Sequence, residues 1–309
     1  MEKEGIEMEY VMELEGLTKS FGRKKAVDNF SLKMEKGHIY GLIGPNGAGK
    51  TTIMRMMAGL TEPDSGAMKF FGSEEVESKR SRMSFIIEEP YMEMNMTARE
   101  NMKYLMYLRG VADEKRIDEL LEYVGLSKTG RKTAGKFSLG MRQRLGLAMS
   151  LLSKPEIMVL DEPINGLDPE GILDIRKMLA ELAAKENMTI LISSHILKEL
   201  SALCTDYAIV REGTLIEELS AEELLAKTRS YVVMATNDIN RTTAVLEEKL
   251  GIHEYKVTYD NEILIYERLD EIETLSKTVT DSGLIITRLN PEGESLEEYY
   301  IGKVGGDNE

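Results

Sequence analysis

A glycine-rich stretch near residue 45 constrains the fold of this chain more than any other part of its sequence. It reads Gly44-Pro45-Asn46-Gly47-Ala48-Gly49-Lys50-Thr51-Thr52 and matches the spacing G-x-x-x-x-G-K-S/T. The short apolar run at residues 38–43 predicts a buried strand before it, and residues 51–60 predict a helix after it. In such a turn the backbone N–H groups surround phosphate oxygens, and the helix N-terminus adds its positive dipole end. The sequence therefore predicts a phosphate-binding loop within a sheet covered by helices.

Strand and helix patterns alternate through the first 220 residues. Two further apolar runs, at residues 156–160 and 189–193, are typical of strands buried on both faces, and an amphipathic helix is expected between them at about 170–186. A β-rich segment is expected at 10–34, with a turn at 20–25. Helical periodicity is expected at about 98–124, with a break at Gly110 and a cap at Asp113. A helix is also expected at 145–152, ended by Pro155. This alternation predicts an α/β fold with a parallel sheet.

The chain changes character after Ser220. Residues 221–309 hold nine basic and 19 acidic residues, which places ten of the fifteen net negative charges in this part. The pattern there predicts strand, helix, two strands, helix and strand, at residues 231–235, 239–250, 255–259, 263–266, 272–280 and 284–289. This β-α-β-β-α-β order is typical of the ferredoxin-like arrangement. We therefore expect an acidic accessory domain at 221–309, separate from a domain at 1–220 that carries the phosphate loop.

The composition excludes several classes of protein. With 39 basic and 54 acidic residues the net charge is −15, which argues against a nucleic-acid-binding protein because such proteins need a basic face. Cys204 is the only cysteine, so a disulfide framework is excluded and a reducing compartment is expected. No stretch approaches the roughly 18 apolar residues of a membrane-spanning helix, and the acidic start Met1-Glu2-Lys3-Glu4 does not fit a signal peptide. Membrane contact is therefore expected only through a partner.

Side chains suited to nucleotide chemistry follow the strands of the predicted sheet. Lys50 can reach the β- and γ-phosphates of a nucleotide, and the Thr51 hydroxyl can ligate Mg²⁺. Asp161 and Glu162 follow the strand at 156–160, at the edge where parallel sheets bind ligands. Asp161 suits the Mg²⁺ shell there, and Glu162 suits a base that orients or deprotonates a water attacking the γ-phosphate. An isolated Asp-Glu pair after a strand is more often a helix cap or a solvated turn, but the nearby phosphate loop favours the functional interpretation.

Further motifs complete a resemblance to the ATP-binding domains of ABC ATPases. Phe137-Ser138-Leu139-Gly140-Met141-Arg142-Gln143-Arg144 ends 17 residues before Asp161 and resembles the signature motif of that family. Asn165-Gly166-Leu167-Asp168 resembles its D-loop, and His195 its switch histidine. These motifs span residues 10–220. The resemblance implies a P-loop NTPase fold with a parallel core, an antiparallel β part and a helical subdomain at about residues 90–150.

Two departures from the family pattern are informative. The family signature usually reads L-S-G-G-Q, and here Leu139 replaces the first glycine and Met141 the glutamine. Glu88 occupies the position of the Q-loop glutamine; the alternatives are that Glu89 faces the site instead, or that both are solvated. Both departures resemble the branch that contains bacitracin-resistance and lantibiotic-immunity ATPases. The ending Ser295-Leu296-Glu297-Glu298-Tyr299-Tyr300 resembles the chain ends of that branch as well.

The resemblance also implies site roles. Phe21 would stack on the adenine of ATP, Glu162 would act as catalytic base, and His195 would contact the γ-phosphate. Mg²⁺ would be held by Thr51, Asp161 and Glu88. The phosphates would be bound by the loop residues Gly44, Asn46, Gly47, Ala48, Gly49, Lys50, Thr51 and Thr52.

The partners that the resemblance implies are a second copy of the chain and a membrane permease. Ser138 and Gly140, together with Asp168, would complete the nucleotide site of the second copy, so that two chains hold two ATP molecules head to tail. Met92, Met94, Met96, Met102 and Met106 form a methionine-rich stretch that is either core or an adaptable groove for a partner helix.

The function expected from the resemblance is ATP hydrolysis that powers transport. The chain would be a cytoplasmic subunit, peripheral at the inner face of the cell membrane, that drives a separate polytopic permease in the efflux of a peptide antibiotic or similar amphipathic compound. The alternatives are an ATPase of an importer and a soluble ABC ATPase acting in DNA repair or on ribosomes. Proteins of the soluble class usually carry two cassettes, long coiled-coil insertions or basic arms. This chain has one cassette and a net negative charge.

Overall fold

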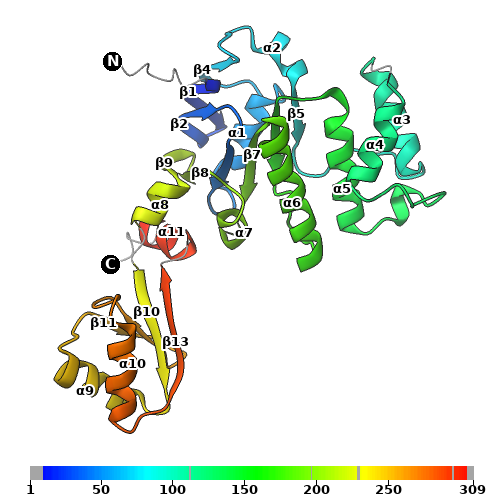
Figure 1. Cartoon of the computed structure of the whole chain (residues 1–309). Helices are drawn as coiled ribbons and strands as arrows, with labels where there is room; N and C mark the ends of the chain where they lie inside the picture. Colours follow the sequence, from blue (N-terminus) through cyan, green and yellow to red (C-terminus); the bar gives the residue numbers. More distant parts are fainter. Residues whose placement is uncertain (1–9, 111–112, 196, 228–229, 294–295, 305–309) are drawn as a thin grey trace, which may run out of the picture. The chain divides into compact units, whose positions relative to one another are not determined.

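The computed structural model describes residues 10–110, 113–195, 197–227, 230–293 and 296–304. Two features used above, the acidic start at Met1 to Glu4 and the residue Ser295, lie outside these ranges. The chain divides into two compact units, Met1–Ala221 and Glu222–Glu309, whose elements are labelled in Figure 1. Among the described residues, no helix is both long and apolar enough to cross a membrane.

The first unit is built on a six-stranded sheet with the order β5-β6-β7-β3-β8-β9. The bounds are β3 (Ile39–Ile43), β5 (Met83–Ile86), β6 (Ile157–Asp161), β7 (Thr189–Ser194), β8 (Asp206–Arg211) and β9 (Thr214–Ser220). Neighbouring strands from β5 to β8 are parallel, and β9 pairs antiparallel with β8. Every residue of β3, β6 and β7 is buried, because helices and a second sheet cover both faces, and this explains the continuous apolar runs. The predicted parallel α/β core is confirmed.

A second, antiparallel sheet has the order β2-β1-β4. It is formed by β1 (Tyr10–Phe21), β2 (Lys24–Glu35) and β4 (Ser65–Phe70), with a tight turn between β1 and β2. Its inner face shares one hydrophobic core with the helix after the phosphate loop and with the central sheet. Fully buried members of that core include Leu14, Phe30, Met57, Phe70 and Val159.

Some helices of the first unit cover the central sheet, and others form a separate group. α1 (Lys50–Met57) starts in the phosphate loop, α6 (Pro169–Glu186) connects β6 to β7, and α7 (Leu197–Ser201) leads toward β8. Figure 1 shows α3 (Ala98–Leu108), α4 (Lys115–Tyr123) and α5 (Leu139–Ser150) grouped on one side of this unit. Short elements complete it: the helix α2 (Val76–Lys79) and 3₁₀ turns at Arg80–Arg82, Ala134–Lys136 and Leu151–Ser153.

Two helix boundaries differ from the expected ones because of local capping. α5 begins at Leu139, before the expected start at residue 145, because the Ser138 hydroxyl accepts a hydrogen bond from the Met141 N–H at 3.3 Å. The cap residue of α4 is Glu114 rather than Asp113, whose carboxylate instead accepts from the Lys115 N–H at 3.2 Å. Most of the signature motif therefore lies on the first turns of α5.

The second unit carries a four-stranded antiparallel sheet with the order β11-β12-β10-β13. Its elements are β10 (Ser230–Thr236), α9 (Ile239–Leu250), β11 (Tyr255–Val257), β12 (Ile263–Ile265), α10 (Ile272–Asp281) and β13 (Ile286–Gly293). Both helices pack on the sheet through buried side chains, among them Val232 and Met234 of β10, Leu246 of α9 and Leu275 of α10. This confirms the ferredoxin-like arrangement. Two helices were not expected, α8 (Ala221–Lys227) and α11 (Leu296–Val304).

Candidate nucleotide-binding site

A cavity of about 530 Å³ opens where β3 and β6 end. It lies at the carboxyl edge of the parallel strands, where α/β sheets bind ligands. The residues that line it come from the phosphate loop, the β1–β2 turn region and the segments after β6 and β7. They are Phe21, Lys24, Ala26, Asn46, Gly47, Ala48, Gly49, Lys50, Thr51, Thr52, Glu162, Asn165 and His195.

Glycine is required at two points of the loop for steric reasons. Gly49 has φ +104°, in the left-handed region, and a Cβ there would lie 2.4 Å from the carbonyl oxygen of Ala26. At Gly44 a Cβ would lie 2.4 Å from the carbonyl oxygen of Val210. The backbone therefore passes too close to its neighbours for any side chain at either position. This close packing restricts the backbone path of the loop beside the cavity.

Lys50 is a buried cation at the base of this loop. Its side chain is 6% exposed, and its Nζ donates to the carbonyl oxygens of Gly44 at 2.6 Å and Pro45 at 3.2 Å. Burial lowers the pKa of the Lys50 ammonium, whereas the nearby carboxylates of Glu162 and Asp161 oppose this shift. The nearest carboxylate oxygen, Oε1 of Glu162, lies 3.8 Å from Nζ. A phosphate entering the loop would give this cation a closer anionic partner.

Asp161, the last residue of β6, is buried and accepts two hydroxyl hydrogen bonds. Thr51 Oγ1 donates to Oδ2 at 2.8 Å, and Ser193 Oγ donates to Oδ1 at 2.6 Å. The described residues contain no group of three or more His, Cys, Asp or Glu side chains that could hold a metal ion. A hydroxyl and a carboxylate beside a phosphate loop instead fit Mg²⁺, which takes one or two protein ligands together with phosphate oxygens and water.

Glu162 turns its carboxylate toward His195. Its Oε2 lies 2.7 Å from His195 Nδ1, and the two side chains are 23% and 40% exposed. The backbone of Glu162 is in the left-handed region with φ +51°, and its N–H donates to Ser193 Oγ at 2.9 Å. The carboxylate therefore lies in the cavity next to His195, and its role as a general base stays a prediction.

Glu88 lies outside the residues that line the cavity. Its carboxylate is paired with Arg55 of α1, with Oε1 3.0 Å from Nη2, and both side chains are largely exposed. The Glu88 backbone is in the left-handed region with φ +66°. The Glu88 side chain thus contacts Arg55, and a role of Glu88 toward Mg²⁺ stays a prediction.

Ser138, Gly140 and Asp168 also lie outside the cavity lining. Ser138 caps α5, and Asp168 caps α6 by accepting from the Gly171 N–H at 3.3 Å. Their contribution to the site of a second copy stays a prediction.

Three residues were not expected from the sequence, Lys24 and Ala26 in the cavity and Ser193 beneath it. Lys24 and Ala26 line the cavity together with Asn165 of the expected D-loop, and Ser193 bonds both members of the Asp161-Glu162 pair. A hydroxyl at the end of a buried apolar strand was the available signal for Ser193. The strand register that brings it to Asp161 is not visible in the sequence.

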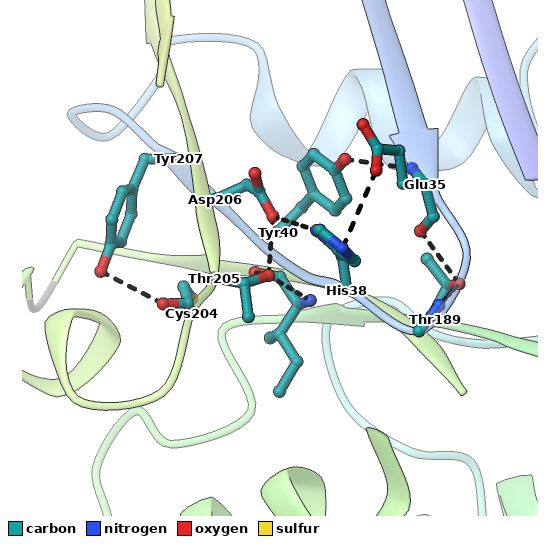
Figure 2. Close-up of polar contacts among 10 residues, drawn as sticks. Glu35, His38, Tyr40, Thr189, Cys204, Thr205, Asp206 and Tyr207 are labelled. Atoms are coloured by element: carbon teal, nitrogen blue, oxygen red, sulfur yellow. Dashed lines mark hydrogen bonds and ion pairs between the residues drawn. The ribbon is translucent and has the colours of Figure 1, made fainter. Parts of the chain in front are cut away.

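A second polar cluster, shown in Figure 2, lies around the opposite, amino-terminal ends of the same strands. His38 Nδ1 lies 2.8 Å from Asp206 Oδ2, which also accepts from Thr205 Oγ1 at 2.6 Å. Tyr40 Oη accepts from the Glu35 N–H at 3.0 Å, and burial raises the Tyr40 pKa. The polar groups of this cluster hydrogen-bond one another and link the starts of β3 and β8.

Comparisons with known proteins agree with this geometry. A family model described as "ABC transporter" matches residues 27–165. The bacitracin transport ATP-binding protein BcrA of Bacillus licheniformis is 40% identical over 302 residues, which cover 97% of this chain and 99% of that protein. The lantibiotic transport ATP-binding protein SrtF of Streptococcus pyogenes is 42% identical over 208 residues, 67% of this chain and 90% of its own. A solved ATP-binding subunit of an ABC transporter superposes with a TM-score of 0.63 at 26% identity, over 70% of this chain and 92% of its own.

Proposed function

Because the chain belongs to the family of ABC transporter ATP-binding proteins, we propose that its ATP hydrolysis drives export of a peptide antibiotic through a separate membrane permease. The activity itself, ATP binding and hydrolysis, follows from family membership. Export of a peptide is supported by similarity to proteins named for bacitracin and lantibiotic transport. The observation that carries the hydrolysis part of the proposal is that the phosphate loop, Glu162 and His195 line one cavity.

ATP would lie along the cavity with its base at Phe21 and its phosphates in the loop. Phe21 is 56% exposed at the rim, which leaves an aromatic face free to stack on adenine. The N–H groups of residues 46–52 and the α1 N-terminus would bind the α- and β-phosphates, and Lys50 would neutralise the β- and γ-phosphates.

Mg²⁺ fits the oxygens at the α1 N-terminus. The Thr51 hydroxyl and the Asp161 carboxylate, 2.8 Å apart, would hold it. An ion held by these two residues would supply positive charge against the negative charge that develops on the phosphates. Ser193 keeps Asp161 oriented from the far side of the carboxylate. Participation of Glu88 would require its ion pair with Arg55 to open.

Hydrolysis would use Glu162 and His195 as a pair. Glu162 would accept a proton from the attacking water, and His195 Nδ1 at 2.7 Å would hold the carboxylate in place. His195 is itself 40% exposed and lines the cavity, and its other ring nitrogen would contact the γ-phosphate. The second copy would bring Ser138, Gly140 and Asp168 to the open side of the nucleotide, in a head-to-tail dimer.

The permease would dock on the helical group of the first unit, on the inner side of the cell membrane. A groove of about 180 Å³ lies there between β5, α3 and α5, lined in part by Tyr91, Tyr104 and Leu108, all of which are exposed. Met92, Met102 and Met106 are buried, which favours the core interpretation for most of the methionine-rich stretch. Tyr91, Tyr104 and Leu108, rather than the three buried methionines, would therefore contact a permease helix.

Cell resistance measured together with ATP hydrolysis tests this proposal. Cells that express the chain with its permease should gain resistance to bacitracin or a lantibiotic, and the Lys50→Ala variant should remove the gain. Resistance that persists in the variant, or a purified chain that releases no phosphate from Mg-ATP, would contradict the proposal.

A further inference from the structure

A buried hydroxyl beneath the nucleotide site contacts both acidic residues of the Asp161-Glu162 pair. From its contacts we infer that Ser193 is a positioning residue for ATP hydrolysis, an inference that rests on the proposed roles of those two residues. Ser193 is the fifth residue of β7 and is 0% exposed. The parallel pairing of β6 with β7 sets Ser193 directly opposite Asp161. Ser193 therefore acts through its neighbours and does not touch the nucleotide.

The Ser193 hydroxyl is the donor in one of its two hydrogen bonds and the acceptor in the other. The Oγ–H donates to Asp161 Oδ1 at 2.6 Å, and Oγ accepts from the Glu162 N–H at 2.9 Å. A serine hydroxyl has one proton to donate, so its donation to Asp161 fixes the direction in which its lone pairs point. The orientation of the Asp161 carboxylate and the position of the Glu162 backbone are therefore coupled through one atom.

The bond to Glu162 matters because the backbone there is in an unfavourable conformation. At φ +51°, Glu162 occupies the left-handed region, which residues with a side chain rarely adopt without local support. This conformation sends the carboxylate toward His195 Nδ1 at 2.7 Å. Without the acceptor at Ser193 Oγ, the Glu162 N–H loses its hydrogen-bond partner. The Glu162 backbone, and with it the direction of the Glu162 carboxylate, is then less restricted.

The bond to Asp161 leaves its other oxygen for the Mg²⁺ side of the site. Oδ2 faces Thr51 Oγ1, and Oδ1 faces Ser193. Because the phosphate contacts proposed for Lys50 and the loop do not involve Ser193, the hydroxyl should affect the chemical step more than ATP binding.

The Ser193→Ala variant removes both hydrogen bonds and little else. We expect kcat to fall about 10- to 100-fold, since small misplacements of reacting groups have effects of this order. The Kd for ATP, measured without turnover with a fluorescent ATP analogue, should change by less than about threefold, because the phosphate loop is intact. Ser193→Thr keeps the hydroxyl on a strand that favours β-branched residues, and it should restore most of kcat.

Thr189 offers a matched control on the same strand. Its hydroxyl is equally buried, accepts from the Gly37 N–H at 2.9 Å and donates to the Glu35 carbonyl at 3.3 Å, at the opposite end of β7 (Figure 2). Thr189→Val removes a doubly bonded hydroxyl without approaching the nucleotide. Its melting temperature should fall by a similar amount to that of Ser193→Ala, whereas its kcat should stay within twofold of the parent value.

The outcomes separate this inference from the proposed function. A kcat for Ser193→Ala within twofold of the parent overturns the inference, and so does an equal loss of kcat in Thr189→Val. If Ser193→Ala does not fold, Ser193→Cys is the second variant, because a thiol has a similar volume and is a weaker hydrogen-bond donor. A kcat of Ser193→Cys equal to that of the parent overturns the inference as well. A parent chain that hydrolyses no ATP refutes the proposed function instead.

Discussion

Replacing Glu162 with glutamine tests the chemistry of the site most sharply. The amide has the size and polarity of the carboxylate but cannot accept a proton from water. Its side-chain oxygen or nitrogen can still pair with His195 Nδ1, now 2.7 Å from Oε2, so the local geometry should survive. The variant therefore tests the basicity of the residue 162 side chain while keeping its position.

The expected magnitude follows from the contacts of Glu162. A positioned general base contributes about 10²- to 10⁴-fold to a rate, which is about 2.7 to 5.5 kcal/mol of barrier. The Lys50 ammonium keeps its hydrogen bonds to the Gly44 and Pro45 carbonyls, at 2.6 and 3.2 Å, both shorter than its 3.8 Å distance from Glu162 Oε1. We expect kcat to fall at least about 100-fold while the Kd for ATP stays within a few-fold.

The assay is phosphate release at saturating Mg-ATP, with binding followed separately by a fluorescent ATP analogue. Light scattering should detect a dimer that persists with ATP in the variant, because hydrolysis no longer reopens it. Glu181→Gln is the control, since Glu181 is an exposed carboxylate on α6 outside the cavity lining. A Glu162→Gln variant with a rate within about tenfold of the parent would refute the assigned base.

Three further changes and one labelling experiment have defined outcomes. Lys50→Ala should raise the Kd for ATP about tenfold or more, because a charge-assisted contact with the phosphates is lost; unchanged binding would remove Lys50 from the site. Glu88→Gln should leave ATP affinity within a few-fold and reduce permease-stimulated hydrolysis, with Glu89→Gln as the comparison; two silent variants would end a role for this loop. A truncated chain ending at Ala221 should still bind ATP, and loss of binding in a folded truncate would contradict the independence of the first unit. The thiol of Cys204 is buried and its pKa is raised by that burial, so it should react with thiol reagents near neutral pH only on unfolding; fast labelling of the native chain would argue otherwise.

The strands and the phosphate loop could be predicted because their signals lie within a few consecutive residues. The apolar runs of β3, β6 and β7 indicate burial on both faces of the sheet. The glycines of the loop indicate a backbone that is too crowded for side chains. The ferredoxin-like order in the second unit was predictable for the same reason.

Contacts across the sheet and between loops were not predictable in this way. The bond from Ser193 to Asp161 depends on the register of two strands that lie about thirty residues apart in sequence. The ion pair of Glu88 with Arg55 depends on where an exposed loop passes α1. The early start of α5 depends on a cap at Ser138, which its hydrophobic pattern did not reveal.

The rate of phosphate release per chain, measured as a function of protein concentration, tests the central claim most directly. If a second copy completes the site through Ser138 and Gly140, Mg-ATP hydrolysis should need two chains. We expect phosphate release that depends on Glu162, with a rate per chain that rises with concentration until dimers saturate. No release above background at any concentration, or a rate per chain that stays constant down to dilutions where light scattering shows only monomers, would contradict it.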